Sequence, residues 1–494
     1  MKLADENAKA FSKLSALKAY PEYDRASLKS GIVHIGVGGF HRAHQAYYIQ
    51  NLLQLGGSKD WAICGVGLME ADRRVCDALE QQDGLYTLVN RYADGDVSAE
   101  VIGSVIEVML APDNPASVIN KLAAAETKLV TLTITEGGYN FHPETEEFNF
   151  DDDKVRHDLA HPDTPISVFG FITAALTKRK EKGVRGFTIL SCDNVQKNGD
   201  VAKKVFLDFA QRQQPENLSW FEQNVSFPNS MVDRITPSTS ETTLDFVENK
   251  LGIVDQVPVN SEPYSEWVIE DDFILGRPSL EQVGVKFVAD VAPYEEMKLR
   301  VLNAGHSLLG IAGALCGYET IDQCANDDIL QKYLRAYWDH EVTPVLSLCE
   351  NTDVEHYKNT VAERFKNVYI KDTVDRICSE SSAKLPKFVI PTITNNLAGS
   401  GQIKLSALLI ALWCFYCDKQ INEFGGHIAM SDDRGDLLAT SAQGSSDNPT
   451  SFLELEEVFG SLASCERFVK VYKEYLESLN TGSNVRQTIA AAIA

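Results

Sequence analysis

The chain has 494 residues, of which 44% are hydrophobic, so it is long enough to bury a large core and to form two or three domains. Its 70 acidic and 46 basic residues give a formal charge of −24, which repels nucleic-acid phosphates and anionic lipid headgroups. We therefore expect a globular protein with no nucleic-acid partner and no membrane partner.

Targeting signals and a metal centre are not expected either. The first eleven residues mix acids and bases and lack the apolar core of a secretory signal. The longest strongly apolar stretch, 405–417, is too short to cross roughly 30 Å of hydrocarbon, so we predict a buried helix. The ten cysteines are scattered, and the single C-x-x-C, Cys414 and Cys417, has no second pair to complete a zinc site. We expect a cytoplasmic protein with reduced thiols.

From residue 31 to about 290, short β-rich segments alternate with longer helical ones, which is typical of a doubly wound parallel sheet. The strands are predicted at 31–38, 61–68, 128–135 and 186–192. The apolar spacing predicts helices at 41–55, 71–80, 115–124 and 166–182. Strand-like segments near Val232 and Val285 predict that this domain ends in an extended or antiparallel portion.

After Pro293 the periodicity becomes helical, with helices predicted at 294–318, 328–350 and 405–419. The sequence therefore predicts an α/β domain over 1–290 and a mostly α-helical domain over 291–494. Ligand sites in such proteins often lie between domains, at the carboxyl ends of the strands. A low-complexity stretch around Gly444 is predicted to be an exposed loop.

The first predicted strand ends in a glycine-rich turn, and a helix begins at once. Glycines at 36 and 38 permit a tight turn and the close approach of a pyrophosphate, which would lie at the helix N-terminus. His41 stands where G-x-G-x-x-G has its third glycine, so the match is incomplete. This Rossmann-type motif predicts a dinucleotide site made of Gly36, Val37, Gly38, Gly39 and Phe40, with Arg42 as a charge contact and Asp72 on the ribose.

The second predicted strand is followed by Glu70 and Asp72, either of which could accept hydrogen bonds from an adenosine ribose, which favours NAD over NADP. The spacing from the glycines exceeds the usual twenty or so residues. Arg73 and Arg74 also stand close enough to tolerate a 2′-phosphate. The H-x-x-H of the first helix has no third ligand nearby, so packing or backbone bonding is the better interpretation of that pair.

Lys298, Asn303 and His306 form a K-x(4)-N-x(2)-H array. In an α-helix, at about 100° per residue, Asn303 would lie roughly 140° and His306 roughly 80° from Lys298. The three would share a broad sector that can line a pocket. A lysine whose pKa is lowered by burial can transfer a proton, while the amide and imidazole bond the same oxygen. The alternative is an amphipathic helix with a solvated lysine, a capping asparagine and a core histidine.

Five ordered segments, GVGGFHRAHQAYY, LTITEGGY, SCDN, MVDRITP and YEEMKLRVLNAGH, resemble the polyol-specific long-chain dehydrogenases, which form the mannitol dehydrogenase family. The resemblance spans nearly the whole chain. It implies metal-free, NAD-dependent hydride transfer at C2 of a polyol, such as D-mannitol, to give a ketose, such as D-fructose. One departure is Ala71, which separates two acids that are adjacent in some relatives and leaves the strictness of NAD preference open.

The same resemblance implies the roles of the site residues. Lys298 would be the general base, and the amides of Asn194 and Asn303 would hold the reacting oxygen. His306 would orient the substrate, and Glu295 would gate proton exchange unless it is an ordinary solvated acid. The residues implied for the other hydroxyls are Asp233, Arg376 and Lys384, each of which could instead be a structural ion-pair residue.

Several alternatives stay open at this point. A family member acting on a sugar acid, such as a fructuronate reductase, or on D-arabinitol would keep the same array, and a protein that only senses NAD(H) would not turn over. Tyr294 and Lys298 also fit the Y-x-x-x-K of short-chain dehydrogenases. That pair lies much later in the chain than in that class, and it leaves Asn303 and His306 unexplained. By resemblance we expect a monomer.

Overall fold

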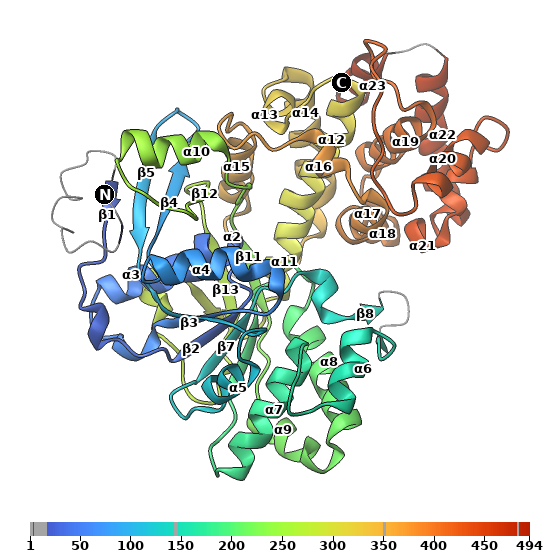
Figure 1. The fold of residues 1–494 in the computed structure, drawn as a ribbon. Coiled ribbons are helices and arrows are strands. Elements are labelled where there is room, and N and C mark those ends of the chain that lie inside the picture. The colour runs from blue at the N-terminus through green and yellow to red at the C-terminus, as the bar shows by residue number, and fades with distance from the viewer. Residues whose placement is uncertain (1–2, 4–16, 143–146, 349–351, 482–483) are drawn as a thin grey trace. The chain divides into compact units, whose positions relative to one another are not determined.

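The computed structural model describes residues 3, 17–142, 147–348, 352–481 and 484–494. Contacts between Cα atoms divide the chain into two compact units, Met1–Ala292 and Pro293–Ala494. The first unit contains a parallel sheet with helices on both faces, and the second is helical (Figure 1). The predicted fold class, a Rossmann-type domain followed by a mostly α-helical one, is confirmed.

The central sheet of the first unit is parallel throughout, in the order β10-β7-β2-β3-β6. The strand β2 lies in the middle, and the chain adds β3 and β6 on one side of it before adding β7 and β10 on the other. The strand order therefore reverses beside β2, where such sheets bind ligands. All four predicted strands are present: β2 (Ile32–Ile35), β3 (Ile63–Gly67), β7 (Leu129–Leu132) and β10 (Thr188–Ser191), with β6 (Val105–Leu110) in addition.

Helices cover both faces of this sheet because alternate strand residues are apolar on both sides. Val33 and Ile35 point into the cluster shared with α5 (Pro115–Ala123), α7 (Val168–Glu181) and α8 (Asn198–Gln213). Ile32 points the other way, toward α3 (Gln45–Gln54) and α4 (Arg73–Gln81). Figure 1 shows these two groups of helices on opposite sides of the strands. The helix predicted over 41–55 is broken at His44 into α2 (Gly39–Ala43) and α3.

Two smaller sheets extend the first unit. One has the order β11-β13-β14 and contains one antiparallel pair, β11 with β13. It agrees with the extended or antiparallel portion predicted for the end of this domain. The order β1-β5-β4-β12, built around the antiparallel pair β4 and β5, was not predicted. Their bounds are β1 (Leu17–Ala19), β4 (Tyr86–Arg91), β5 (Val97–Ile102), β11 (Ser230–Asp233), β12 (Val259–Ser261), β13 (Glu266–Glu270) and β14 (Lys286–Val288). The unit also has a pair, β8 (Phe141–His142) and β9 (Glu147–Phe148), and the helices α6 (Asp153–Ala160), α9 (Leu218–Asn224) and α10 (Glu241–Asp245).

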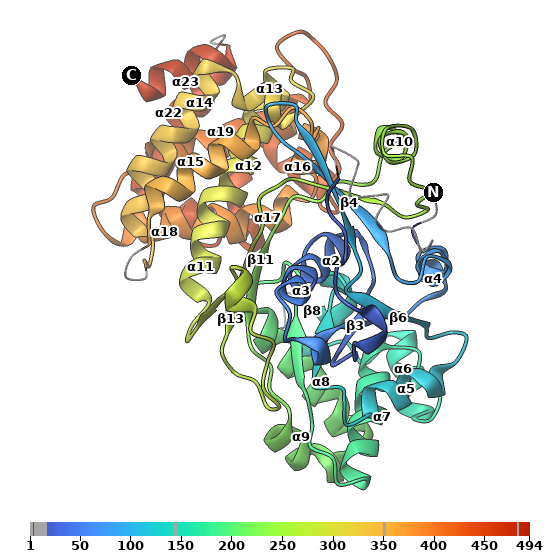
Figure 2. The same cartoon turned by 90° about the vertical axis from the view of Figure 1, so that its left-hand side faces the viewer.

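The helical unit is built around α12 (Ala304–Leu315) and α19 (Lys404–Lys419), which lie side by side (Figure 2). Residues 405–414 of α19 are all buried, as expected for a helix that is apolar on every face. Its first turn is capped by the buried carboxylate of Glu341, which accepts hydrogen bonds from the backbone N–H groups of Leu405 at 2.5 Å and Ser406 at 2.8 Å. The other helices are α11 (Ala292–Met297), α13 (Ile321–Ala325), α14 (Asp328–Tyr337), α15 (Val354–Phe365), α16 (Val374–Cys378), α17 (Ser381–Phe388), α18 (Ile390–Ala398), α20 (Gly435–Gly444), α21 (Glu456–Phe459), α22 (Glu466–Asn480) and α23 (Val485–Ile493).

Two predictions for this unit were partly wrong. The helix predicted over 328–350 is regular only in α14, because a π-helical turn (Trp338–Val342) and a 3-10 turn (Thr343–Val345) follow it. The last two residues of that prediction lie outside the described part of the chain. The loop predicted around Gly444 is helical as far as that glycine, because Leu438 and Ala442 are buried and anchor α20 in the core.

Candidate active site

The glycine-rich turn after β2 is shaped for the close approach of a ligand. Gly36 has φ +98°, and a Cβ there would lie 2.1 Å from the Thr133 carbonyl oxygen, so only glycine fits. At Gly38 a Cβ would meet nothing closer than a backbone oxygen at 4.0 Å. Gly38 is also the N-cap of α2, and no side chain of the described residues caps that helix. The open space beside uncapped backbone N–H groups fits a dinucleotide pyrophosphate.

The neighbouring residues of the turn point into the protein. Val37 is buried, and its methyl groups fill the space that a side chain at Gly65 of β3 would need. Phe40 stacks on His44, with ring centroids 5.0 Å apart. Val37 and Phe40 therefore shape the turn by packing, with Val37 buried and Phe40 half-buried.

His41, which replaces the third glycine of the motif, is fully buried and stacks on His34 of β2 with ring centroids 3.3 Å apart. His34 bonds through its two ring nitrogens to Thr131 Oγ1 at 2.8 Å and to the Gly36 carbonyl at 2.9 Å. Burial lowers the pKa of His34 to about 3 and holds that of His41 well below its usual value. In the usual motif, a glycine at this position lets the helix pack closely on the strand. Here α2 packs on β2 through the stacked, neutral rings of His41 and His34.

The buried histidines predict a loss of stability in acid. An unfolded histidine takes up a proton near pH 6.5, whereas folded His34 does so only near pH 3. Between these values the unfolded state binds more protons, so the free energy of unfolding falls as the pH is lowered, by roughly 1 kcal/mol from this group at pH 5.5. Urea unfolding at pH 7.5 and 5.5 should show a smaller loss in His34→Gln. The exposed His427→Gln is the control, and an unchanged pH dependence in His34→Gln would refute the assignment.

Arg42 does not lie where the sequence suggested. Its guanidinium is buried, donates to the Val257 carbonyl and lies over the ring of Tyr86 at 5.4 Å. The Tyr86 hydroxyl in turn donates to the Arg42 carbonyl at 2.6 Å. The side chain therefore ties α2 to the sheet β1-β5-β4-β12, and we correct the expectation of a charge contact to phosphate.

The acids after β3 have different environments. The Asp72 carboxylate accepts hydrogen bonds from the backbone N–H groups of Leu68 at 2.8 Å and Met69 at 2.9 Å, which closes the turn after the strand. Glu70 is exposed and paired with Arg73, which also binds Asp113 at 2.7 Å. Arg73 is therefore neutralised by acids on both sides, an arrangement that disfavours a 2′-phosphate and agrees with NAD preference.

Two further predicted residues lie at strand ends of the first unit. Asn194 is exposed and follows β10, and Asp233 is the last residue of β11 and is 5% exposed. Because parallel strands end at one edge of the sheet, the structure brings Asn194 to the same edge as the glycine turn.

In the helical unit, the segment from Lys298 to Asn303 is π-helical, lying between α11 and α12. Residues five apart lie above one another in an i→i+5 helix. Asn303 is therefore brought to the same face as Lys298, and the angle of roughly 140° expected for an α-helix does not apply. Lys298 is buried, and the Asn303 Oδ1 atom is buried with no hydrogen-bond partner among the described residues. A buried acceptor of this kind is costly unless a ligand supplies a donor.

The neighbours of this turn hold it in place. The indole Nε1 of Trp338 donates to the Val301 carbonyl at 2.9 Å, and its ring packs where a side chain at Gly305 would clash. His306 is buried on α12 and its ring lies 4.1 Å from that of Phe365. Glu295 is also buried, three residues before Lys298 on α11. The sequence carries no signal that distinguishes this π turn from an α-helix.

Arg376 and Lys384 lie close together in the same unit. Arg376 is exposed and forms a two-pronged ion pair with Asp372, with Nε to Oδ1 at 2.6 Å. Lys384 is half-buried on α17, and its Nζ donates to the carbonyls of Arg376 at 3.3 Å and Ile377 at 3.2 Å. Burial, and then the charge of Arg376, lowers the pKa of Lys384.

No group of three potential metal ligands occurs among the residues that the structure describes. His44 bonds to the Glu266 carbonyl at 2.9 Å, which supports the packing interpretation of H-x-x-H. Cys414 and Cys417 are both buried on α19, and the nine cysteines within the described ranges form no disulfide. Over the same ranges, no helix is long and apolar enough to cross a membrane.

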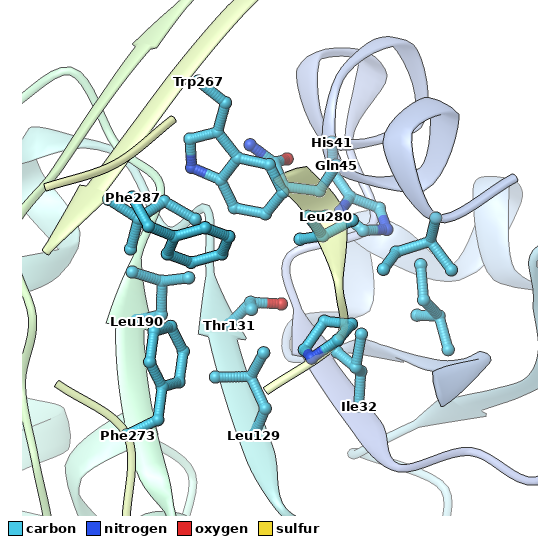
Figure 3. A pocket seen from close by; sticks show the side chains of 14 residues that line it. Ile32, His41, Gln45, Leu129, Thr131, Leu190, Trp267, Phe273, Leu280 and Phe287 are labelled. Carbon is cyan, nitrogen blue, oxygen red and sulfur yellow. The ribbon is translucent and has the colours of Figure 1, made fainter. Parts of the chain in front are cut away.

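A small cavity of about 10 Å³ lies in the first unit between the central sheet and the strands β13 and β14 (Figure 3). Its wall includes Trp267, Phe273, Leu280 and Phe287, whose rings and methyl groups face Leu129 across the space. It has room for about one water molecule. The cavity is therefore a packing defect and not a substrate site.

A glycine turn at the switch point of a parallel sheet, followed by a helical unit that carries a buried lysine, a half-buried asparagine and a buried histidine, defines a two-domain Rossmann-type dehydrogenase. The family model of the mannitol dehydrogenase Rossmann domain matches residues 30–282, and that of the mannitol dehydrogenase C-terminal domain matches residues 290–480. The chain belongs to the mannitol dehydrogenase family.

Individual relatives agree. A mannitol 2-dehydrogenase of Phaeosphaeria nodorum is 41% identical over 98% of this chain and 85% of its own. Mannitol dehydrogenase DSF1 of Saccharomyces cerevisiae is 40% identical over 96% and 94%. The ternary complex of Pseudomonas fluorescens mannitol 2-dehydrogenase with NAD and D-mannitol is 41% identical, with a TM-score of 0.85 over 99% of both chains. A substrate-free D-sorbitol dehydrogenase has a TM-score of 0.91 at 34% identity, covering 98% and 99%.

Proposed function

We propose that the protein oxidises D-mannitol to D-fructose, reversibly and without a metal, using NAD. It is an NAD-dependent polyol dehydrogenase. The observation that carries the proposal is the π turn that aligns buried Lys298 with Asn303, in a chain that is 41% identical to two mannitol 2-dehydrogenases. A proton acceptor, Lys298, and an amide, Asn303, on one face of a helix can contact the same carbinol group.

We assign NAD binding to the first domain, 1–290, and substrate chemistry to the second, 291–494. Gly36 makes the tight turn, and the backbone at Gly38 and Gly39 holds the pyrophosphate, because the space beside these two glycines is open at the start of α2. Val37 and Phe40 shape this turn. Glu70 and Asp72 are the candidate ribose acceptors, Asp72 through the carboxylate oxygen that does not cap the turn. When bound, the nicotinamide accepts the hydride that leaves C2.

The side chains divide the remaining chemistry. Lys298 takes the proton of the C2 hydroxyl, and the amides of Asn194 and Asn303 donate to the oxygen as negative charge develops on it. His306, held against Phe365, orients the substrate, and Glu295 relays the proton from Lys298 to water. Asp233, Arg376 and Lys384 bind the other hydroxyls, and such contacts discriminate strongly among polyols.

The environments of Arg376 and Lys384 favour a neutral polyol over a sugar acid as the substrate. A uronate enzyme needs a cation for the terminal carboxylate. Asp372 already neutralises Arg376, and the pKa of Lys384 is lowered, so these two candidates are poor carboxylate partners. Sorbitol is the stronger second candidate, because a D-sorbitol dehydrogenase shares this fold at a TM-score of 0.91. We retain a cytoplasmic monomer as part of the proposal.

The direct test is the initial rate of NADH formation at 340 nm by chelator-treated protein. D-Mannitol, D-sorbitol, D-arabinitol and D-mannonate are compared at equal concentration with NAD⁺. We expect the highest kcat/KM with mannitol and a rate that chelation leaves unchanged. A preference for mannonate would move the protein to the sugar-acid branch of the family. Activity lost on chelation and restored by zinc would refute the metal-free mechanism, and the absence of turnover on every substrate would favour an NAD(H) sensor.

A further inference from the structure

Asp193 lies where β10 ends, directly before Asn194, and its side chain is bonded to the loop that follows the neighbouring strand β7. It is 9% exposed. Its carboxylate accepts hydrogen bonds from the backbone N–H groups of Ile134 at 3.0 Å and Thr135 at 2.9 Å, and from the hydroxyl of Tyr139 at 2.8 Å. One buried carboxylate thus fastens the loop after β7 to the residue that precedes Asn194.

Thr135 has a backbone conformation that a β-branched residue rarely adopts. Its φ is 66° and its ψ is 166°, a region populated almost only by glycine. Such strain persists only where the surroundings impose it. Asp193 bonds to the N–H group of this residue, so the carboxylate is part of what imposes it.

The backbone of Asp193 is also fixed from the other side. The buried Asn198 side chain donates from Nδ2 to the carbonyls of Asp193 at 3.1 Å and Ser230 at 2.9 Å. It accepts in return from the Ser230 N–H group at 2.9 Å. The segment that carries Asn194 is therefore bonded to the loop after β7 through Asp193 and to β11 through Asn198.

We propose that Asp193 is a positioning residue, which sets the place of the Asn194 amide by locking the loop after β7 in its strained conformation. It acts through Asn194 and does not touch the reacting atoms. The inference rests on the proposed function, in which Asn194 donates to the substrate oxygen. A small misplacement of such a donor weakens transition-state binding because the geometry must be preorganised.

A double-mutant cycle tests this inference in the full-length chain with NAD⁺ and D-mannitol. We expect Asn194→Ala to lower kcat about 100-fold, the usual cost of a lost oxyanion donor, and Asp193→Asn to lower it about tenfold. Because Asp193 acts through Asn194, the double variant should lie within about twofold of Asn194→Ala. A double variant about tenfold below Asn194→Ala would show independent effects and overturn the inference.

Asp158→Asn is the matched control. Asp158 is fully buried in the same unit and accepts from the N–H groups of Ile166 and Ser167, each at 2.8 Å, and from the Ser167 hydroxyl at 2.6 Å. It has one contact more than Asp193, from His157 Nδ1 at 3.0 Å, but it lies on α6 and caps the start of α7, away from the strand ends. We expect a similar fall in Tm with kcat within about twofold of the parent chain. A loss of kcat equal to that of Asp193→Asn would overturn the inference.

Two more variants keep the test decisive. Adding Thr135→Gly to Asp193→Asn should raise kcat by about threefold, since glycine adopts this conformation without the hydrogen bond to the Asp193 carboxylate. No restoration counts against the inference. If Asp193→Asn does not fold, Tyr139→Phe removes one hydrogen bond to the carboxylate, and a kcat unchanged by that variant would also count against it. An Asn194→Ala variant with full kcat would instead contradict the proposed function.

Discussion

Lys298→Ala is expected to lower kcat for mannitol oxidation by about 10³- to 10⁴-fold, the upper part of the range for loss of a general base. Lys298 is buried in the π turn that also carries Asn303, and it is the residue to which we assign the proton transfer. The Kd for NAD should change little, because the glycine turn belongs to the other unit. Initial rates and fluorescence titration with NADH measure the two quantities.

Three comparisons make this prediction specific. A small primary amine added to Lys298→Ala should restore part of the rate, because it can take the proton in place of the lost side chain. Lys387→Ala, which removes an exposed lysine of α17, should leave kcat unchanged. Tyr294→Phe should also retain activity. If Tyr294→Phe is as inactive as Lys298→Ala, the tyrosine is the acid and base, and our assignment of Lys298 is wrong.

Gly38→Ala should weaken NAD binding by about 100-fold, or about 2.7 kcal/mol, while the fold stays intact. Apart from its chain neighbours, the added methyl group meets no atom of the described residues closer than 4.0 Å, and Gly38 has φ −77°, which alanine adopts readily. The methyl group would instead occupy the space that we assign to the pyrophosphate. Titration of the variant with NADH, together with its Tm, separates binding from stability.

Gly36→Ala and Gly399→Ala are the two controls for Gly38→Ala. At Gly36 a Cβ would lie 2.1 Å from the Thr133 carbonyl oxygen and φ is +98°, so this variant should lose Tm as well as NAD binding. At Gly399 nothing lies within 4 Å and φ is −112°, so that variant should lose neither. Gly38→Ala protein that binds NADH as tightly as the parent chain would remove the glycine turn from the proposed cofactor site.

Local patterns in the sequence were enough to predict most of the architecture. Four β-rich segments separated by amphipathic helices predicted the parallel sheet, because strand and helix periodicity are properties of neighbouring residues. The glycine turn was recognisable because only glycine tolerates the positive φ and the close backbone contact at Gly36. The antiparallel pair β4 and β5 was missed, although Asp94 and Gly95 between its strands are a turn signal.

The sequence by itself thus determined the fold class, the glycine turn and which residues carry the candidate chemistry. Tertiary structure alone decided how several of those residues are used. Arg42 turns inward because the Val257 carbonyl, more than 200 residues away in the chain, binds its guanidinium. The segment from Lys298 is π-helical and not α-helical, with Trp338 bonded to the Val301 carbonyl and packed on Gly305. Contacts between residues far apart in sequence leave no periodic signal, so these features become visible only when the chain is folded.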